Sequence, residues 1–331
     1  NTSAPVIETK KNSYGQDIYQ EGICSKQFQF TSNFSDSGIA NYFLKDKDCI
    51  SKRTKFGYKN LSMALSNPIG SNLLHLYQSI ELPTQREIYD EAKRLIALKH
   101  ITKKGKILTF LNHRNKHHYS NFDNRSFVEE NIKTFEYLTD RGFMIPIVGN
   151  DKSGGRVYDS LNLMPSWIRK LIKIDGEPTV EIDFRALHPN IAMCIYGGQK
   201  KFITHQQIAE ESGVDISKVK IEHLSFFNQK VHEMRNSVLY DYYNISEGEM
   251  INRIIEDKYN SRDKHRITSK KLFKREVGIM TNCIIRLNSQ GIYVGYVFDA
   301  FFCKEKDAKT VVEIMNEEVL KNNVYTTAKY E

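Results

Sequence analysis

Two aspartates occupy positions where a carboxylate needs a chemical reason. Asp183 ends the apolar, strand-like run Thr179–Ile182, and Asp299 lies between the strand-like runs Tyr293–Phe298 and Phe301–Cys303. An ionised acid at the end of a core strand is costly unless a cation compensates it. Two Mg²⁺ ions about 3.5 to 4 Å apart support phosphoryl transfer, and each needs only one or two protein carboxylates beside phosphates and waters. Asp183 and Asp299 are therefore candidate ligands of two Mg²⁺ ions that bind with a nucleoside triphosphate.

Each aspartate also has a structural interpretation. Asp183 could cap the helix that begins near Pro189, and Asp299 could be an ordinary turn former. Taken singly, these interpretations are favoured, so the surrounding residues must decide between structure and chemistry.

Composition narrows the choice of partner. The chain has 331 residues and a formal net charge of +8, with a sequence pI near 9.0, and this excess points to nucleic acid more than to a membrane. Five widely spaced cysteines without a CxxC pair indicate neither a disulfide framework nor a zinc knuckle. No apolar run approaches the roughly 18 residues of a membrane span, and no signal-peptide pattern opens the chain. We therefore expect a cytoplasmic or nucleic-acid-associated intracellular protein.

The texture of the chain changes at Gly149–Gly155, a run typical of a linker or long turn. Before it, Thr84–Leu98 and Ser126–Arg141 carry apolar residues at helical spacing. We therefore expect a helix-rich N-terminal domain over residues 1–150 and a second domain over residues 151–331.

The second domain is predicted to mix strands and helices. Pro178–Phe184 predicts a buried strand and Pro189–Tyr196 an apolar helix closed by glycine. The region from about 203 to 286 is predicted to be helical. The last part then reads as strand, tight turn, strand and helix, with Asp299 at the turn. The chain as a whole is predicted to be α+β.

Two blocks of this domain resemble a known family. The first holds Gly155-Arg156, Asn162-Leu163, Pro165, Arg169 and then Asp183-Phe184-Arg185-Ala186-Leu187-His188; the second holds Val297-Phe298-Asp299-Ala300. In order and chemistry they resemble the palm of family A DNA polymerases, an architecture also used by single-subunit phage RNA polymerases. The resemblance covers about the C-terminal half. It implies an antiparallel palm sheet with helices and short helical fingers inserted at about 199–270, whereas the N-terminal half resembles nothing that we can name.

The resemblance also implies roles for individual residues. Asp183 and Asp299 would bind the two Mg²⁺ ions, and Arg156 and Arg169 would contact primer or template phosphates, although a solvated surface arginine is an equal alternative for Arg169. A fingers helix must present a lysine to the triphosphate, and the candidates for its lysine, base-stacking and sugar-contacting positions are Lys220, Leu224 and Asn228. The alternative is that Lys220 is only the wet face of an amphipathic helix.

A rival fingers motif lies nearer the second aspartate. Arg266 and Lys270 have the Arg-x-x-x-Lys spacing, but they stand close before Asp299. We read Lys271–Leu287 as a helix that leads into the hairpin and could carry Arg275 or Arg286 toward the template.

Several positions depart from the family pattern. His188 stands where the family has a sugar-discriminating Glu, and Asn228 stands where it has the partner Tyr. Phe298 and Ala300 replace the His and Glu that flank the second aspartate. Sugar choice is therefore open, and activity could be reduced or lost. His188 could equally be a satisfied histidine at a helix N-terminus.

Two basic segments fit a nucleic-acid channel. Lys99–Lys116 carries six Lys or Arg and no acid, including Lys103, Lys104 and Lys106, and Lys258–Arg275 carries eight basic residues. Phosphate contact is the functional interpretation and a solvated face is the alternative. His113, His117 and His118 lack a convincing fourth zinc ligand, so we expect no metal there.

The sequence thus predicts template-directed nucleotidyl transfer by two Mg²⁺ ions, as a DNA polymerase or with primase or RNA polymerase activity. The expected partners are a DNA or RNA template-primer, nucleoside triphosphates and replication proteins, and the resemblance suits a phage, plasmid or mobile element. Two alternatives stay open: a non-catalytic replication protein with a degenerate palm, and a metal-dependent nuclease that uses Asp183, His188 and Asp299.

Overall fold

A computed structural model describes residues 7–12, 14–16, 28–31, 45–102, 104–139, 144–199 and 202–330. The chain divides into two compact units, residues 1–54 and residues 55–331. In the first unit, β1 (Ile7–Thr9) pairs antiparallel with β2 (Phe28–Phe30). Helix α2 (Lys47–Ser66) begins in that unit and continues into the second. The predicted domain boundary near residue 150 falls inside the second unit and stays a prediction.

The second unit is built on one antiparallel sheet. Its strand order is β10-β11-β9-β8-β3, and β12 pairs with β9 on the side away from β11. The bounds are β3 (Ile80–Glu81), β8 (Lys173–Ile174), β9 (Glu177–Phe184), β10 (Gly295–Val297), β11 (Ala300–Lys304) and β12 (Ala328–Tyr330). The predictions of an α+β chain and of an antiparallel sheet are confirmed.

Strand β9 has two different faces. Ile182 and Phe184 are buried, whereas Glu181 and Asp183, which alternate with them, are only partly buried. Because successive side chains of a strand point to opposite faces, Glu181 and Asp183 share one face. The predicted strand ending near Phe184 is therefore confirmed, with its carboxylates on the less buried side.

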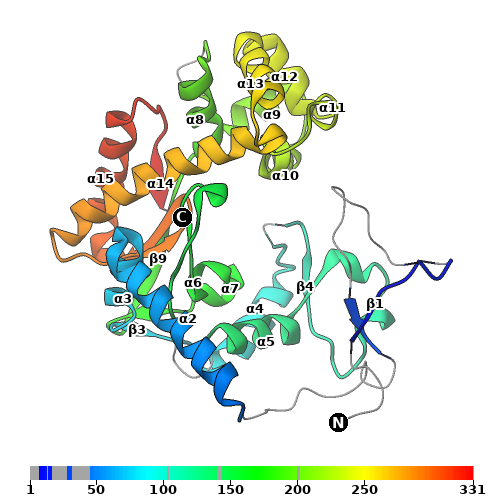
Figure 1. Cartoon of the computed structure of the whole chain (residues 1–331), viewed down its shortest axis with the longest axis vertical. Coiled ribbons are helices and arrows are strands. Elements are labelled where there is room, and N and C mark those ends of the chain that lie inside the picture. The colour runs from blue at the N-terminus through cyan, green and yellow to red at the C-terminus, as the bar shows by residue number, and fades with distance from the viewer. Residues whose placement is uncertain are drawn as a thin grey trace. The chain divides into compact units, whose positions relative to one another are not determined.

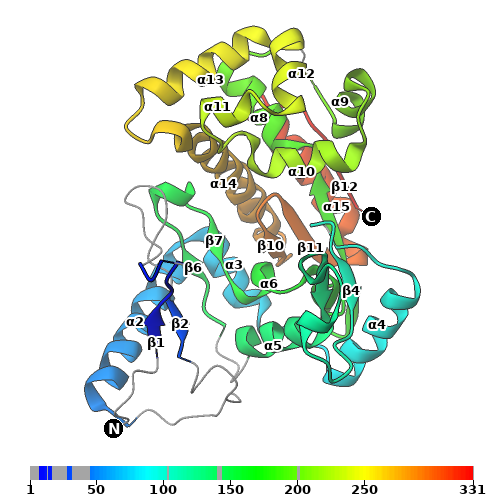
Figure 2. The same ribbon diagram turned by 90° about the vertical axis from the view of Figure 1, so that its right-hand side faces the viewer.

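The helices of this unit pack against the sheet or against one another (Figure 1). They are α3 (Pro68–Leu76), α4 (Gln85–Ala97), α5 (Val128–Thr139), α6 (Ser160–Leu163), α7 (Ser166–Arg169), α8 (Leu187–Tyr196), α9 (His205–Ser212), α10 (Ile216–Phe226), α11 (Val231–Met234), α12 (Val238–Ser246), α13 (Gly248–Asn260), α14 (Ile267–Asn288) and α15 (Ala308–Lys321). Figures 1 and 2 show α9 to α13 gathered together, with α14 running from them to the hairpin of β10 and β11.

Local chemistry explains where several helices begin and end. Thr84 caps α4 in a capping box with Glu87, each side chain accepting from the other residue's backbone N–H. Gly197 ends α8 in the left-handed conformation that glycine tolerates, with φ 77°. The predicted helices near residues 84–98, 126–141 and 189–196 are confirmed as α4, α5 and α8, although residues 140–143 lie outside the described part.

Smaller pairs and turns complete the unit. Strands β4 (Ile107–Thr109) and β5 (Arg125–Phe127) run parallel, whereas β6 (Ile147–Val148) and β7 (Val157–Tyr158) run antiparallel. Single 3₁₀ turns are η1 (Lys116–His118), η2 (Phe122–Asn124), η4 (Asp151–Ser153), η5 (Lys264–Arg266) and η6 (Glu305–Asp307). The run that the sequence predicts as a linker is thus a turn between β6 and β7.

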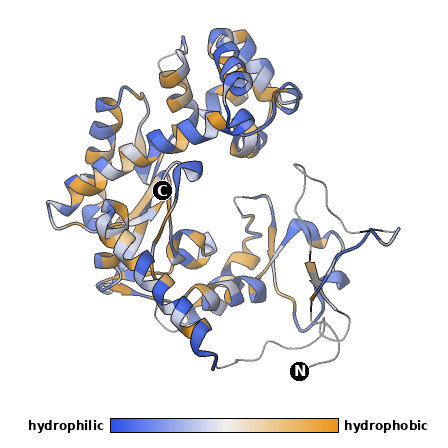
Figure 3. Ribbon diagram, in the orientation of Figure 1, coloured by the Kyte–Doolittle hydropathy of each residue, from blue (hydrophilic) through white to orange (hydrophobic). Residues whose placement is uncertain are grey.

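The core lies between the sheet and the long helices. Met280, Cys283 and Ile284 of α14 are fully buried, as are Val311 and Met315 of α15. Figure 3 shows hydrophobic and hydrophilic residues on each of these helices, as expected of amphipathic helices that cover a sheet.

A buried amide ties α3 to the hairpin strand. Asn72, fully buried, donates from its Nδ2 to the carbonyl of Val294 at 2.6 Å, and its Oδ1 accepts from the Val294 N–H at 3.1 Å.

None of the described helices is both long and apolar enough to cross a membrane. Cys49, Cys194, Cys283 and Cys303 are free thiols.

Candidate active site

The sheet brings the two predicted aspartates together. Asp183 of β9 is the Cα partner of Ala300 in β11, and Asp299 directly precedes Ala300. With strands about 4.8 Å apart and a rise of about 3.4 Å per residue, the two aspartate Cα atoms lie roughly 6 Å apart. The prediction that they meet at one end of a sheet is confirmed, despite their separation in the sequence. Their catalytic roles stay predictions.

The hairpin that carries Asp299 is unusually tight. Val297 pairs with Ala300, so only Phe298 and Asp299 form the loop. Phe298 has φ 59°, a left-handed value at the position where two-residue hairpin loops normally place glycine. A bulky residue in this region is strained, and such strain is held by surrounding contacts. The aromatic rings of Tyr158 and Tyr296 lie edge-on to Phe298, at 5.8 and 6.1 Å between centroids.

A glycine turn brings Arg156 to the same place. Gly154 has φ +64°, and a Cβ added to it would lie 2.6 Å from the Cβ of Phe273 and 2.7 Å from the backbone N of Lys274. Only glycine therefore fits where this turn meets α14. Arg156 follows two residues later, between the turn and β7.

Arg156 enters a partly buried charge network with two residues that lie far from it in sequence, Glu276 and His188. Its Nε donates to Oε1 of Glu276 at 2.8 Å, and its Nη2 donates to Oε2 at 2.6 Å. The Nε2 of His188 lies 2.5 Å from the same Oε2. The Arg156 guanidinium carbon also stands 3.6 Å from the ring centroid of Phe273 and 4.7 Å from that of Phe298.

The electrostatics join this network to Asp299. Burial raises the pKa of Asp299, and the charge of Glu276 raises it further, while His188 and Arg156 oppose the shift. Burial alone would raise the pKa of Glu276, but the hydrogen bond and charge of His188, with Arg156, bring it below its ordinary value. Negative charge at Asp299 is thus under-compensated, and a cation there would be stabilised.

The donor set fits Mg²⁺. Among the described residues no group of three or more His, Cys, Asp or Glu side chains is arranged to hold a metal ion. Mg²⁺ in nucleotide sites, however, commonly binds one or two carboxylates and fills its shell with phosphates and waters. Two adjacent carboxylates, one of them poorly compensated, match that requirement, and Asp183 and Asp299 are the residues that would hold the ions.

The second predicted phosphate-contacting arginine is placed differently. Arg169 is only 5% exposed, and its Nη2 donates to Glu181 at 3.1 Å while its Nη1 donates to the carbonyl of Leu161 at 3.3 Å. It is neither a solvated surface residue nor open to a phosphate in this arrangement. Instead it compensates the acid that shares a strand face with Asp183.

The predicted fingers face is only partly formed. Lys220 is exposed on α10. The pKa of the neighbouring His205 falls to about 4, mainly because His205 is buried and secondly because of the positive charge of Lys220. Leu224 is 75% exposed. Helix α10 ends at Phe226, so Asn228 lies beyond it and does not extend the helical face, which corrects that prediction. The role of Lys220 itself stays a prediction.

Asn228 and His188 have separate partners. The Oδ1 of Asn228 accepts from Ser269 Oγ at 2.9 Å, whereas His188 contacts Glu276 on α14. The partner of His188 in this fold is therefore Glu276, and no contact between His188 and Asn228 occurs among the described residues.

Helix α14 also carries a line of cations. A cation recurs every four residues, at Arg266, Lys270 and Lys274. These side chains therefore lie along one side of α14, beginning at the residue just before it. Lys270 Nζ pairs with Asp151 at 2.5 Å and Asp263 at 2.8 Å, whereas Arg266 and Lys274 are exposed. The two arginines predicted to reach the template have partners within the fold. Arg275 donates to the Asn322 carbonyl, and Arg286 donates to Glu317 and Glu318 of α15.

The N-terminal basic segment is largely a surface. Lys104 and Lys106 are exposed before β4, and Lys116 lies 3.6 Å from Glu130. Lys103 lies outside the described residues. Exposure agrees with both phosphate binding and a solvated face, so this prediction stays open.

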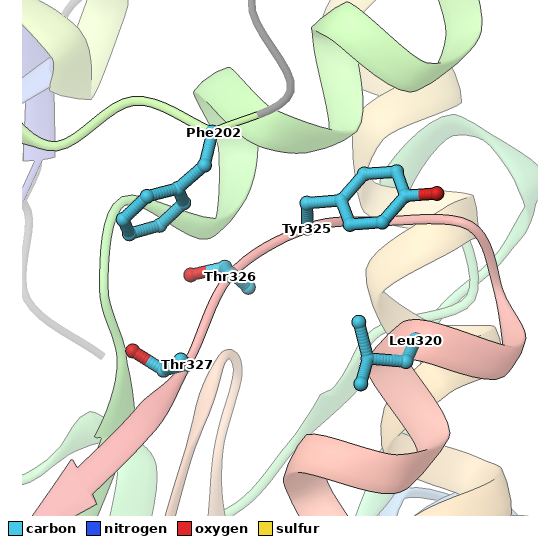
Figure 4. Close-up of a pocket in the computed structure, with 5 residues that line it drawn as sticks. All are labelled: Phe202, Leu320, Tyr325, Thr326 and Thr327. Carbon is cyan, nitrogen blue, oxygen red and sulfur yellow. The ribbon is translucent and has the colours of Figure 1, made fainter.

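Figure 4 shows a hollow that the loop before β12 helps to line. It has a volume of about 200 Å³, and Phe202, Leu320, Tyr325, Thr326 and Thr327 line it. None of these residues belongs to the charge network of Arg156, His188 and Glu276.

Glu276 and Phe273 are the site residues that sequence reasoning missed. Both lie in the segment that the sequence predicts to be a helix leading into the hairpin, but within it only Arg275 and Arg286 are predicted to have a function. A usable signal exists: Glu276 is the one acid within Lys264–Arg286, a strongly basic stretch, and a lone acid in such a stretch predicts a specific cationic partner.

No protein-family model matches the sequence, and no curated protein matches it. Solved structures do match, among them the POL domain of Pol1 from M. smegmatis in complex with DNA primer-template and dNTP. That match has a TM-score of 0.48 and 10% sequence identity, and it covers 80% of this chain and 69% of that chain. A likeness of this degree carries no conclusion about activity.

Proposed function

We propose that the chain catalyses template-directed nucleotidyl transfer at Asp183 and Asp299, as a DNA polymerase or with primase or RNA polymerase activity. The observation that supports this most is the strand register, which sets Asp299 beside the residue that pairs with Asp183. Two acids at that spacing, on neighbouring strands and near the half-buried Arg156, suit a pair of divalent cations better than they suit packing.

In this proposal Asp183 and Asp299 would hold two Mg²⁺ ions, and these would supply activation of the attacking hydroxyl and charge compensation on the triphosphate. Arg156, fixed between two aromatic rings, faces the bound strand or nucleotide. Ala300 leaves no auxiliary carboxylate opposite Asp183. The chemistry therefore depends on the two aspartates alone as protein ligands.

The triphosphate needs a cation, and two helices offer one. Lys220 on α10 is the residue predicted from sequence. Helix α14 is the alternative, because its exposed Arg266 and Lys274 lie along one side of it. Lys274, however, is two residues from the buried Glu276 and therefore faces a different side of the helix. We propose that Lys220 binds the phosphates.

The nucleic acid would extend from this site onto other basic surfaces. Lys104 and Lys106 are exposed on the part of the chain predicted to grip nucleic acid. A phage, plasmid or mobile-element setting rests on the sequence resemblance alone.

Incubation with a primed template, Mg²⁺ and labelled nucleotides tests the proposal. Extension of the primer supports it. Binding without chemistry would instead favour a non-catalytic replication protein, and shortening of the strand would favour a nuclease. Running the assay with deoxy- and ribonucleotides, and with DNA and RNA templates, identifies the substrate.

A further inference from the structure

Glu276 has no part in the proposed chemistry, yet it is fully buried beside it. Its side chain is 0% exposed on α14, and both carboxylate oxygens are used by the same arginine. A buried acid with a charged partner is costly to keep and strongly destabilising to break. Such a pair calls for a reason besides stability.

The contacts of Glu276 fix Arg156 in one orientation. The carboxylate takes Nε and Nη2 as a two-pronged pair, at 2.8 and 2.6 Å. Phe273 lies against the guanidinium at 3.6 Å and Phe298, in the Asp299 turn, lies at 4.7 Å. Within the described part of the chain, Nη1 donates to no acceptor. The two N–H groups of Nη1 are therefore left, on a group that can hardly turn.

The same carboxylate orients His188. Because Nε2 of His188 meets Oε2 of Glu276 at 2.5 Å, Nδ1 is the ring nitrogen left for other partners. His188 lies in the first turn of α8, five residues after Asp183. One acid on α14 thus sets two side chains that come from the glycine turn and from the end of β9.

We propose that Glu276 is a positioning residue, which holds Arg156 so that Nη1 meets a phosphate or sugar oxygen of the nucleotide or strand end bound at Asp183 and Asp299. This inference rests on the proposed function. Preorganisation of this kind removes the cost of ordering a long, flexible side chain when the substrate binds.

A double-mutant cycle tests the proposal. Arg156→Lys keeps the charge but loses the two-pronged pair and the flat stacking, and Glu276→Gln keeps the size but loses the charge. If Glu276 acts through Arg156, each variant slows single-turnover extension by about 10²-fold, and the double variant is no slower than either. Independent effects that multiply to about 10⁴-fold would overturn the proposal.

A matched control separates positioning from stability. Glu318 of α15 is also buried, at 4% exposed, and pairs at 2.7 Å with Arg286 of α14, ten residues beyond Glu276. Glu318→Gln is expected to lower the thermal midpoint comparably but to leave extension within about twofold of wild type. Equal slowing by Glu318→Gln and Glu276→Gln would overturn the proposal.

Failure of the proposed function is distinguishable from failure of this inference. If the unaltered protein extends no primer, the proposed function is wrong. The double-mutant cycle is then measured by binding instead, as the Kd of each variant for a labelled primer-template with Ca²⁺, where no chemistry is needed. Non-additive weakening in that cycle supports the positioning role. An unchanged Kd in both single variants overturns it.

Discussion

Gly154→Ala probes how the glycine turn places Arg156. The new Cβ would lie 2.6 Å from the Cβ of Phe273 and 2.7 Å from the backbone N of Lys274. Both atoms are fixed on α14, so neither can swing aside as the tip of a flexible side chain could. Either the turn or the helix must move, and Arg156 moves with the turn.

The cost has two parts. An alanine held at φ +64° loses about 1 to 2 kcal/mol to left-handed strain, of which about 0.4 to 1 kcal/mol is offset because alanine also restricts the unfolded chain. Overpacking against fixed atoms adds about 1 to 3 kcal/mol. We therefore expect Gly154→Ala to lower the free energy of unfolding by about 2.5 kcal/mol, with slower extension.

Gly213→Ala is the matched control. Gly213 has φ +66°, and nothing lies within 4 Å of an added Cβ. Urea denaturation should show a loss of only about 0.5 kcal/mol there, from strain alone. If the two variants lose the same free energy, the close contact between the turn and α14 is not what requires glycine at position 154, and the reasoning is refuted.

Three further predictions concern pH, salt and sugar. Burial raises the pKa of Asp159 to about 6, so its contribution to stability is present below about pH 4 and is lost as pH rises through about 6. Asp159→Asn should therefore flatten the curve of unfolding free energy against pH between about pH 4 and 6. An unchanged curve would contradict the raised pKa of Asp159. Lys104→Gln with Lys106→Gln should weaken binding to all sequences and lower the slope of log Kd against log salt by about 2, if both lysines contact phosphates; an unchanged slope would show a solvated surface. Ribonucleotides are expected to be incorporated at least comparably with deoxyribonucleotides. His188→Phe should move this preference toward deoxyribonucleotides because the ring nitrogens are lost, and an unmoved preference would mean that His188 does not face the sugar. His188→Glu is no fair test, because it would set a second negative charge against Glu276.

Local patterns were enough to predict the two aspartates and the elements that carry them. Strand β9 and helix α8 follow from apolar runs and a closing glycine, and a tight hairpin follows from the short gap around Asp299. Their meeting could be inferred because both acids stand at strand ends, but the register that joins them depends on pairing across more than a hundred residues.

The contact of Glu276 with Arg156 could not be assigned from local patterns. It exists because the Gly154 turn packs on α14, which brings Arg156 onto an acid 120 residues away in the sequence. Arg169 illustrates the same limit. Its pairing with Glu181 depends on which face of β9 the acid occupies, and the sequence alone left it as a solvated or phosphate-binding residue.

Asn228 shows where helical spacing misleads. The interval of four residues from Leu224 would continue the helix face, but α10 ends at Phe226. Just beyond this end, Lys258 donates to the carbonyls of Phe227 and Gln229, each at 2.9 Å, and to that of His265 at 2.7 Å. These contacts of a buried lysine from another helix are not visible in the local pattern.

The most direct test of the two-aspartate site is single-turnover addition of one labelled nucleotide to a primed template with Mg²⁺. Asp299→Asn is expected to abolish addition while leaving the thermal midpoint at neutral pH unchanged or raised, because the raised pKa of Asp299 marks a charge that the folded state bears at a cost. Asp241→Asn, at an exposed acid of α12, should add the nucleotide at the rate of the unaltered protein. Addition by Asp299→Asn at the unaltered rate would contradict the account.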